Sequence, residues 1–153
     1  MITRRFKNEK RRNVTLVELV VCISIMLLVS TLYFFYDNLD KYYINSFTKQ
    51  LAVDIRYVRR VNMLGDLSTY IYYDLNNENK SYILKSQGEI KKEVSLPNET
   101  KIEYGESKII FRTDGSPDRR GQTIRVYKGN IKKEITIVPI SGRVLLKEGK
   151  YET

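Results

Sequence analysis

Histidine is absent from this 153-residue chain, and cysteine occurs once, as Cys22. Without histidine the chain can form neither a Ser-His nor a Cys-His catalytic pair, and no histidine can ligate a metal ion. One cysteine cannot form a disulfide within the chain. We therefore expect that the chain is not an enzyme, has no metal site or cofactor, and has a binding or structural role.

Proline and glycine are missing from residues 14–64, and charge is missing from the 18 residues Leu19–Tyr36. An apolar run of about this length can span a bilayer as a helix. A cleaved secretory signal is the alternative, but its apolar core is shorter and ends at small residues. This run ends in the aromatic stretch YFFY, which is typical of a retained anchor at the membrane interface.

Beyond residue 40 the apolar residues recur at steps of three and four, which predicts one buried face of a helix. The members of this stripe are Ile44, Phe47, Leu51, Ile55 and Val58. Polar residues fall off the stripe: Lys49, Asp54, Arg56, Arg59 and Arg60. Gly65 is typical of the residue that follows the end of a helix. We expect one helix across residues 14–64; two helices with a break near residues 37–40 remain the alternative.

From Leu67 onward, short runs of β-branched and aromatic residues alternate with Gly, Asn and Pro turns. The pattern predicts seven or eight strands in an antiparallel meander or sandwich. The expected strands are Thr69–Leu75, Ser81–Lys85, Glu89–Leu96, Lys101–Tyr104, Lys108–Thr113, Thr123–Tyr127, Ile131–Val138 and Ile140–Leu146. The predicted fold class is α+β, with the amphipathic half of a long N-terminal helix packed on a small antiparallel β domain.

The charge distribution predicts the topology. The net charge is +9, and residues 1–13 alone carry +5. Basic residues before a first span stay in the cytoplasm, so the C-terminal part is expected outside it. The expected divisions are therefore a basic leader at 1–13, a transmembrane half-helix at 14–36, an amphipathic half-helix at 37–65 and a β domain at 66–153.

Three weaker patterns have ordinary explanations. Ser46 and Lys49 match Ser-x-x-Lys, but the other motifs of serine acylases are missing. Asp114 and Asp118 could offer oxygen ligands to Ca²⁺, although their spacing fits a solvated turn better. A locally basic strand region could meet nucleic acid or an acidic partner, but acids are interspersed and a mixed solvated surface is the simpler interpretation. Its members are Arg119, Arg120, Arg125, Lys128, Lys132, Lys133 and Arg143.

Glu18 is the only charge in residues 14–36. A carboxylate at mid-span costs about 2.5–3.5 kcal/mol, and each Leu, Ile, Val or Phe returns about 0.3–0.6 kcal/mol. Eleven such residues lie in Leu19–Tyr36, so insertion is favoured although Glu18 opposes it. A carboxylate inside a membrane is by default functional and has a partner. The alternative is that Glu18 lies at the headgroups beside Arg12.

The stretch RRNVTLVELVV, residues 11–21, resembles the prepilin signal of type IV pilins and type II secretion pseudopilins. That signal has a basic leader, a cleavage point, a hydrophobic residue, Thr-Leu, a variable apolar residue and Glu. Residues 14–18 fill the first five mature positions, and Glu18 falls on the family's fifth-position glutamate. The C-terminal pattern IIFRTDGSPDRRG…ISGRVLL is similar to the H-type minor pseudopilin domain.

The resemblance implies a pilin-like subunit of a type II secretion, type IV pilus or DNA-uptake (competence) filament. It implies cleavage by a prepilin peptidase between Asn13 and Val14, N-methylation of Val14, and pairing of Glu18 with the N-terminal amine of a neighbouring subunit. Asn13 departs from the usual Gly, and Val14 from the usual Phe. The alternative is an unprocessed, signal-anchored membrane protein whose extracytoplasmic β domain binds a ligand.

Overall fold

The computed structural model describes residues 15–74 and 80–148, with the backbone alone for 35–38 and Glu148. The chain divides into two compact units, Met1–Asn38 and Leu39–Thr153. One helix, α1 (Leu16–Met63), contributes its first part to the first unit and its second part to the second unit. The prediction of one helix rather than two is confirmed. The expected first residue of that helix, Val14, lies outside the described residues.

The end of α1 follows from Gly65. The Gly65 N–H donates to Asn62 O at 2.9 Å, and the Asp66 N–H donates to Val61 O at 3.3 Å. These two bonds define a Schellman motif, in which the residue after the helix adopts a positive φ. Gly65 has φ +100°, which an L residue with a Cβ rarely adopts.

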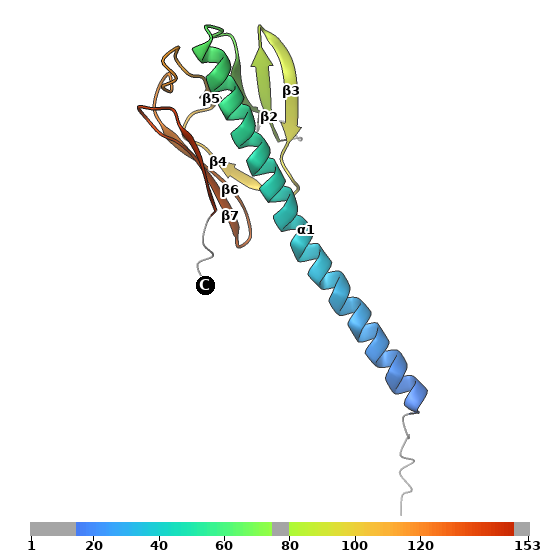
Figure 1. The fold of residues 1–153 in the computed structure, drawn as a ribbon. Helices are drawn as coiled ribbons and strands as arrows, with labels where there is room; N and C mark the ends of the chain where they lie inside the picture. Colours follow the sequence, from blue (N-terminus) through green and yellow to red (C-terminus); the bar gives the residue numbers. More distant parts are fainter. Residues whose placement is uncertain (1–14, 75–79, 149–153) are drawn as a thin grey trace, which may run out of the picture. The chain divides into compact units, whose positions relative to one another are not determined.

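The second unit contains two antiparallel four-stranded sheets (Figure 1). Sheet A has the order β3-β2-β1-β5, and sheet B has the order β4-β6-β7-β8. The chain crosses from sheet A to sheet B at β4, returns for β5 and crosses again for β6, so it is not a simple meander. The bounds are β1 Tyr70–Asp74, β2 Ser81–Ser86, β3 Glu89–Ser95, β4 Lys101–Glu103, β5 Lys108–Ile109, β6 Gln122–Lys128, β7 Ile131–Ile137 and β8 Val144–Glu148.

Both sheets and the second part of α1 share one core. In Figure 1, β2 and β3 lie on one side of this part of α1, and β6 and β7 lie on the other. The predicted apolar stripe is buried as expected, with exposures between 0% and 5%. The core around the stripe also includes Phe111, just after β5, and these strand residues: Ile71, Tyr82, Ile109, Ile124, Val126, Ile135 and Ile137.

Two predicted strands are wrong in extent. The strand expected at Lys108–Thr113 is only two residues long, because the Phe111 N–H donates to Asn62 Oδ1 of α1 at 2.9 Å instead of to a strand. The strand expected from Ile140 begins at Val144. Residues 139–142 form a turn, in which Gly142 has φ +60° and its N–H donates to Val138 O at 2.9 Å.

Candidate assembly site

The first turn of α1 is capped by Thr15. Thr15 Oγ1 accepts a hydrogen bond from the Glu18 N–H at 3.3 Å, and Thr15 O accepts one from the Leu19 N–H at 3.1 Å. A threonine followed three residues later by glutamate is the sequence of a capping box. Glu18 also lies where the positive end of the helix dipole favours an anion. The cap therefore orders the backbone of Glu18 on the first turn of the helix.

The helix that follows Glu18 is apolar on every side. Every large hydrophobic side chain from Leu16 to Phe34 is exposed, by between 49% and 79%. This part of α1 contains a window of mean hydropathy 2.3 of which nothing is buried by the protein itself. By length and composition it can cross a membrane, where lipid rather than protein would cover these side chains.

The hydroxyl groups within this apolar segment bond to the helix itself. Ser24 Oγ donates to Val20 O, Ser30 Oγ to Met26 O and Thr31 Oγ1 to Leu28 O, each at 2.8 Å. These bonds satisfy the hydroxyl donors without a partner outside the helix. The Glu18 carboxylate differs, because it is exposed and no ion pair between described residues reaches it. Glu18 is thus the one charged group in the described part of this segment, and it takes part in no ion pair there.

The two predicted processing residues, Asn13 and Val14, lie outside the described residues. The sequence alone places them directly before Thr15. Cleavage and methylation therefore remain predictions.

One charged group that falls off the predicted apolar stripe is nevertheless buried. Asp54 is 6% exposed, because position 54 flanks the apolar stripe between Leu51 and Val58. Its Oδ2 accepts a hydrogen bond from Tyr82 Oη at 2.7 Å and pairs with Lys92 Nζ at 2.9 Å. Burial, followed by the bond to Asp54, raises the pKa of the Tyr82 phenol. The contacts of Asp54 with Tyr82 and Lys92 hold α1 on sheet A, and no periodicity in the sequence predicts them.

Two further helix side chains hold the loops beside α1. Arg59 donates through Nε to Gly115 O and through Nη2 to Ser141 O, each at 3.0 Å. Asn62 donates through Nδ2 to Asp66 O at 2.6 Å and to Thr69 O at 2.9 Å. These bonds from α1 thus hold the loops at Gly115 and Ser141 and the connection from α1 to β1.

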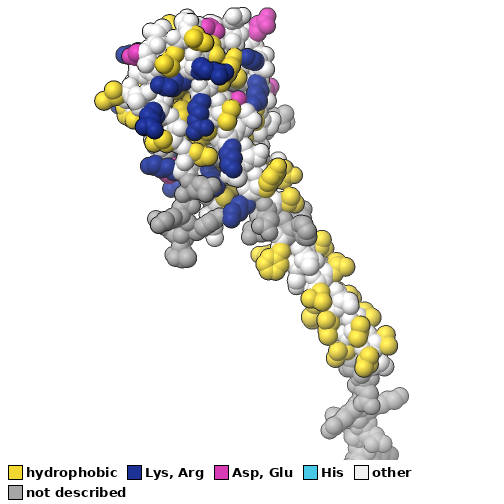
Figure 2. Space-filling model, in the orientation of Figure 1, with side chains coloured by type: hydrophobic (Ala, Val, Ile, Leu, Met, Phe, Trp, Pro, Cys, Tyr) yellow, Lys and Arg dark blue, Asp and Glu magenta, His cyan; other side chains and the backbone are white. Residues whose placement is uncertain are grey.

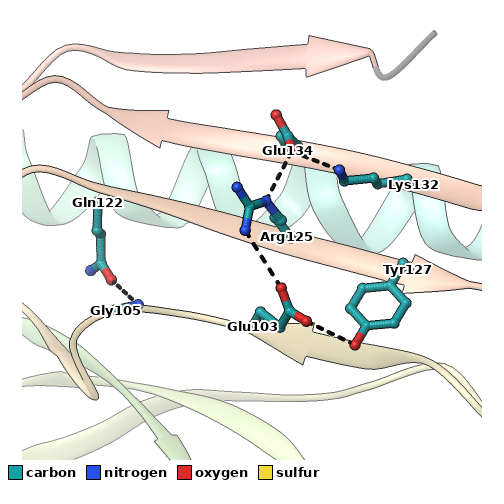
Figure 3. Close-up of polar contacts among 7 residues, drawn as sticks. All are labelled: Glu103, Gly105, Gln122, Arg125, Tyr127, Lys132 and Glu134. Atoms are coloured by element: carbon teal, nitrogen blue, oxygen red, sulfur yellow. Dashed lines mark hydrogen bonds and ion pairs between the residues drawn. The ribbon is translucent and has the colours of Figure 1, made fainter.

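The basic strand region is mostly internally neutralised. Figure 3 shows Arg125 between Glu103 and Glu134, with N–O distances of 3.7 and 3.0 Å. Lys132 Nζ also reaches Glu134 at 3.2 Å, and these two donors lower the pKa of Glu134. Tyr127 Oη donates to Glu103 Oε1 at 3.0 Å, which raises the pKa of that phenol. The mixed, solvated surface that we expected is what sheet B presents here.

The two other candidates do not form sites. Ser46 and Lys49 are exposed on α1, and neither contributes to an ion pair in the described part of the chain. Asp114 Oδ1 accepts from the Ser116 N–H at 2.8 Å and from Ser116 Oγ at 2.6 Å, an ordinary turn that lowers the pKa of Asp114. Among the described residues, no three Cys, Asp or Glu side chains are placed to hold a metal ion.

A long N-terminal helix whose second part packs on antiparallel sheets, with an apolar first part and one acid at its start, defines the pilin-like α+β class. No protein-family model and no curated protein sequence matches the chain. The solved structures do match it.

The type IV minor pilin FimU of Pseudomonas aeruginosa matches in two crystal forms. One gives a TM-score of 0.53 at 15% identity over 67% of this chain and 91% of FimU; the other gives 0.54 at 13% over 71% and 90%. The minor pseudopilin EpsH from the Type 2 Secretion System of Vibrio cholerae gives 0.49 at 9% over 69% and 97%. The FimU matches confirm the predicted pilin-like fold.

Proposed function

We propose that the chain is a minor pilin-like subunit that assembles into, or initiates, a filament of a type II secretion, type IV pilus or DNA-uptake machine. The observation that carries the proposal is the Glu18 carboxylate. It lies on the first turn of an exposed apolar helix, is itself exposed, and takes part in no ion pair among the described residues. The pilin-like fold supports the same role.

The physical reason for assembly is the cost of a lone carboxylate in lipid. An opposite charge supplied only when subunits meet would remove most of that cost. The α-amino group of a processed neighbour is such a charge. Glu18 would then set the register between adjacent helices, and the filament would contain subunits whose C-terminal units lie outside the cytoplasm.

Glu18→Leu tests this proposal. The variant should enter the membrane at least as well as the natural chain, because a charge is removed from hydrocarbon. Its co-purification with other pilin-like subunits should fall strongly, and Glu18→Asp should be intermediate because the carboxylate reaches less far. Ser24→Leu is the matched control, since it removes a polar side chain that bonds only to its own helix. Normal co-purification of Glu18→Leu would overturn the role of Glu18.

Cleavage of the leader distinguishes this proposal from the alternative, an unprocessed membrane anchor. The residue Asn13 favours the alternative. We propose that a prepilin peptidase cuts between Asn13 and Val14 and that Val14 is then N-methylated. Mass spectrometry of the protein from its native host should find a chain that starts at Val14. Asn13→Gly should raise the processed fraction, because Gly permits a closely fitting backbone. An intact Met1 start in cells with an active peptidase would favour the anchor.

A further inference from the structure

A second line of side chains runs along α1, opposite the buried stripe. Its members follow at steps of four and three residues and are all exposed: Lys49, Val53, Arg56, Arg60 and Met63. We call these five residues the basic stripe. Lys49 and Arg60 stand about 16 Å apart along the helix axis. Val53, which lies between the cations, is 54% exposed, and Met63, which follows them, is 44% exposed. The stripe is therefore both cationic and apolar.

The basic stripe has no acidic neighbour on its own helix. The acids of α1 in the second unit are committed elsewhere, since Asp40 pairs with Lys128 at 2.8 Å and Asp54 pairs with Lys92 at 2.9 Å. Arg56 Nη2 donates to Val144 O at 3.1 Å, a neutral group that positions the guanidinium without cancelling its charge. Within the described part of the chain, no ion pair involves a cation of the stripe.

Lys91 of β3 adds a cation beside the stripe. Its Nζ lies 4.4 Å from the centroid of the Tyr57 ring, and the guanidinium carbon of Arg60 lies 5.9 Å from the same centroid. Two cations held near one ring repel each other, and an anion from outside would relieve that repulsion. In Figure 2, dark blue side chains are spread over this face, whereas acidic side chains are few and lie mostly toward its margins.

The composition of the stripe favours a protein partner over nucleic acid. Contacts with phosphate use cationic and polar groups, and an apolar residue such as Val53 gains little from them. The buried centre of a protein interface is apolar and poor in charge, with charged groups around it. Leu64, which is 82% exposed just beyond the stripe, extends the apolar contribution.

A second copy of this chain is a poor partner for the stripe. The unit Leu39–Thr153 contains 21 Lys and Arg against 15 Asp and Glu, a net charge of +6. Many of its acids are already in ion pairs, namely Asp40, Asp54, Glu99, Glu103, Glu106, Asp118 and Glu134. Juxtaposed like charges cost affinity, so the copy would be rejected.

We propose that the basic stripe docks against an acidic face of a different pilin-like subunit. This inference rests on the proposed function and adds the chemistry of the neighbour. The partner surface should present Asp or Glu side chains around an apolar centre that covers Val53 and Met63. The chain would thus be placed beside a chemically distinct subunit rather than in a run of its own copies.

The test uses the full chain in detergent, titrated against each pilin-like protein of its native host in turn. For a partner with an acidic face, Arg56→Glu with Arg60→Glu should weaken binding by about tenfold or more. Replacing partner acids by lysine should restore it. The neutral pair Arg56→Gln with Arg60→Gln should give an intermediate loss. Lys80→Glu with Lys101→Glu is the control, because both residues are exposed and the change in charge is identical.

The outcomes separate the two proposals. If the natural chain binds these proteins and the charge-reversed chain binds equally well, the docking surface is wrong and the proposed function stands. If the natural chain binds none of them, both fail. The same variants are also tested for binding to a short duplex DNA and for self-association. If the charge reversal weakens only binding to DNA, the inference is overturned in favour of nucleic acid. If it weakens only self-association, the inference is overturned in favour of a second copy. Unchanged thermal unfolding of each variant, followed by circular dichroism, confirms that folding is intact.

Discussion

The two parts of α1 treat their apolar side chains in opposite ways. In Leu16–Phe34 all the large hydrophobic side chains are exposed, and they cover every side of the helix. In the part that belongs to the second unit, one stripe is buried by the sheets, and the opposite side carries cations. The first part is suited to a lipid surrounding, and the second to protein on one face and water or a partner on the other.

Polar groups follow the same division. The hydroxyls of the first part bond to carbonyls of their own helix, so they need no other element. In the second part Thr48 also bonds to its own helix, but other polar groups bond across to strands and loops, as Asp54 does to Tyr82 and Asn62 to Phe111. One helix thus carries two kinds of surface, and Glu18 is the group that fits neither.

The largest effect is expected from removing the second part of α1. A chain that starts at Leu39 should unfold cooperatively, because it keeps the stripe that covers both sheets. A chain that starts at Gly65 should aggregate, because the apolar faces of the sheets would be exposed. Size-exclusion chromatography and thermal unfolding of the two chains measure the difference. Equal solubility and equal unfolding temperatures would show that the stripe is not part of the core.

A matched pair of substitutions tests burial at single positions. Ile55→Ala should lower the free energy of unfolding of the second unit by about 2–5 kcal/mol, because a fully buried side chain leaves a cavity. Leu27→Ala, in the exposed part, should leave that free energy unchanged. Urea denaturation of the full chain in detergent, followed by tyrosine fluorescence, provides the measurement. A similar loss for both variants would remove the distinction between the two parts.

The sequence predicts the elements that depend on local pattern. The apolar stripe, the helix end at Gly65 and eight strand positions all follow from periodicity and turn residues. The pairing of β5 with β1 and of β4 with β6 could not be predicted, because it depends on contacts between distant segments. The early end of β5 has the same cause, since Asn62 of α1 takes the Phe111 N–H.

Only part of the candidate site could be predicted, again because some of its features depend on contacts between distant segments. Glu18 stands out because it is the one charge in an apolar run, which is a local signal. The burial of Asp54 could not be predicted, because its partners Tyr82 and Lys92 lie on other elements and compensate it. The basic stripe was visible only as residues off the apolar stripe, and its lack of acids depends on pairs that only the structure describes.

The buried carboxylate gives a smaller and more specific test of the second part of α1. Tyr82→Phe keeps the ring but removes one hydrogen bond to Asp54, at an expected cost of about 1 kcal/mol. Lys92→Met should cost more, about 1–3 kcal/mol, because it leaves a buried carboxylate with fewer donors. Lys92 is 35% exposed on its side chain, which limits the loss through solvent screening.

The double variant Asp54→Leu with Lys92→Met is the control for that test. It removes both charges together, and it is made in the Tyr82→Phe background so that no buried hydroxyl loses its acceptor; it should then recover part of the stability that Lys92→Met loses in the same background. Urea denaturation of all three variants provides the comparison. A double variant that is less stable than Lys92→Met in that background would show that the carboxylate itself, rather than its loss of a partner, holds α1 on sheet A.

The smallest effect is expected from pH, and it should arise in the second unit alone. Hydrogen bonds from Arg125 and Lys132 lower the pKa of Glu134 below its ordinary value of 4.5, and those from Ser68 and Thr69 lower that of Asp66 below 3.8. A group whose pKa is lowered by folding stabilises the fold above its unfolded pKa, and that contribution is lost as pH falls through the folded pKa. Stability should therefore decline gradually below about pH 4.5.

Lys128 has the opposite effect on the pH dependence of stability. Its hydrogen bond to Asp40 raises the pKa of the ammonium above its ordinary value of 10.5. Its contribution is present below the unfolded pKa and is lost as pH rises through the folded one. Urea midpoints of the full chain in detergent should thus be flat at neutral pH and fall on the acid side. Glu134→Gln should flatten the acid limb, whereas Glu89→Gln, at an exposed residue without an ion pair among the described residues, should not. An acid limb that Glu134→Gln leaves unchanged would mean that the ion pairs of Glu134 with Arg125 and Lys132 contribute nothing to the stability of the unit.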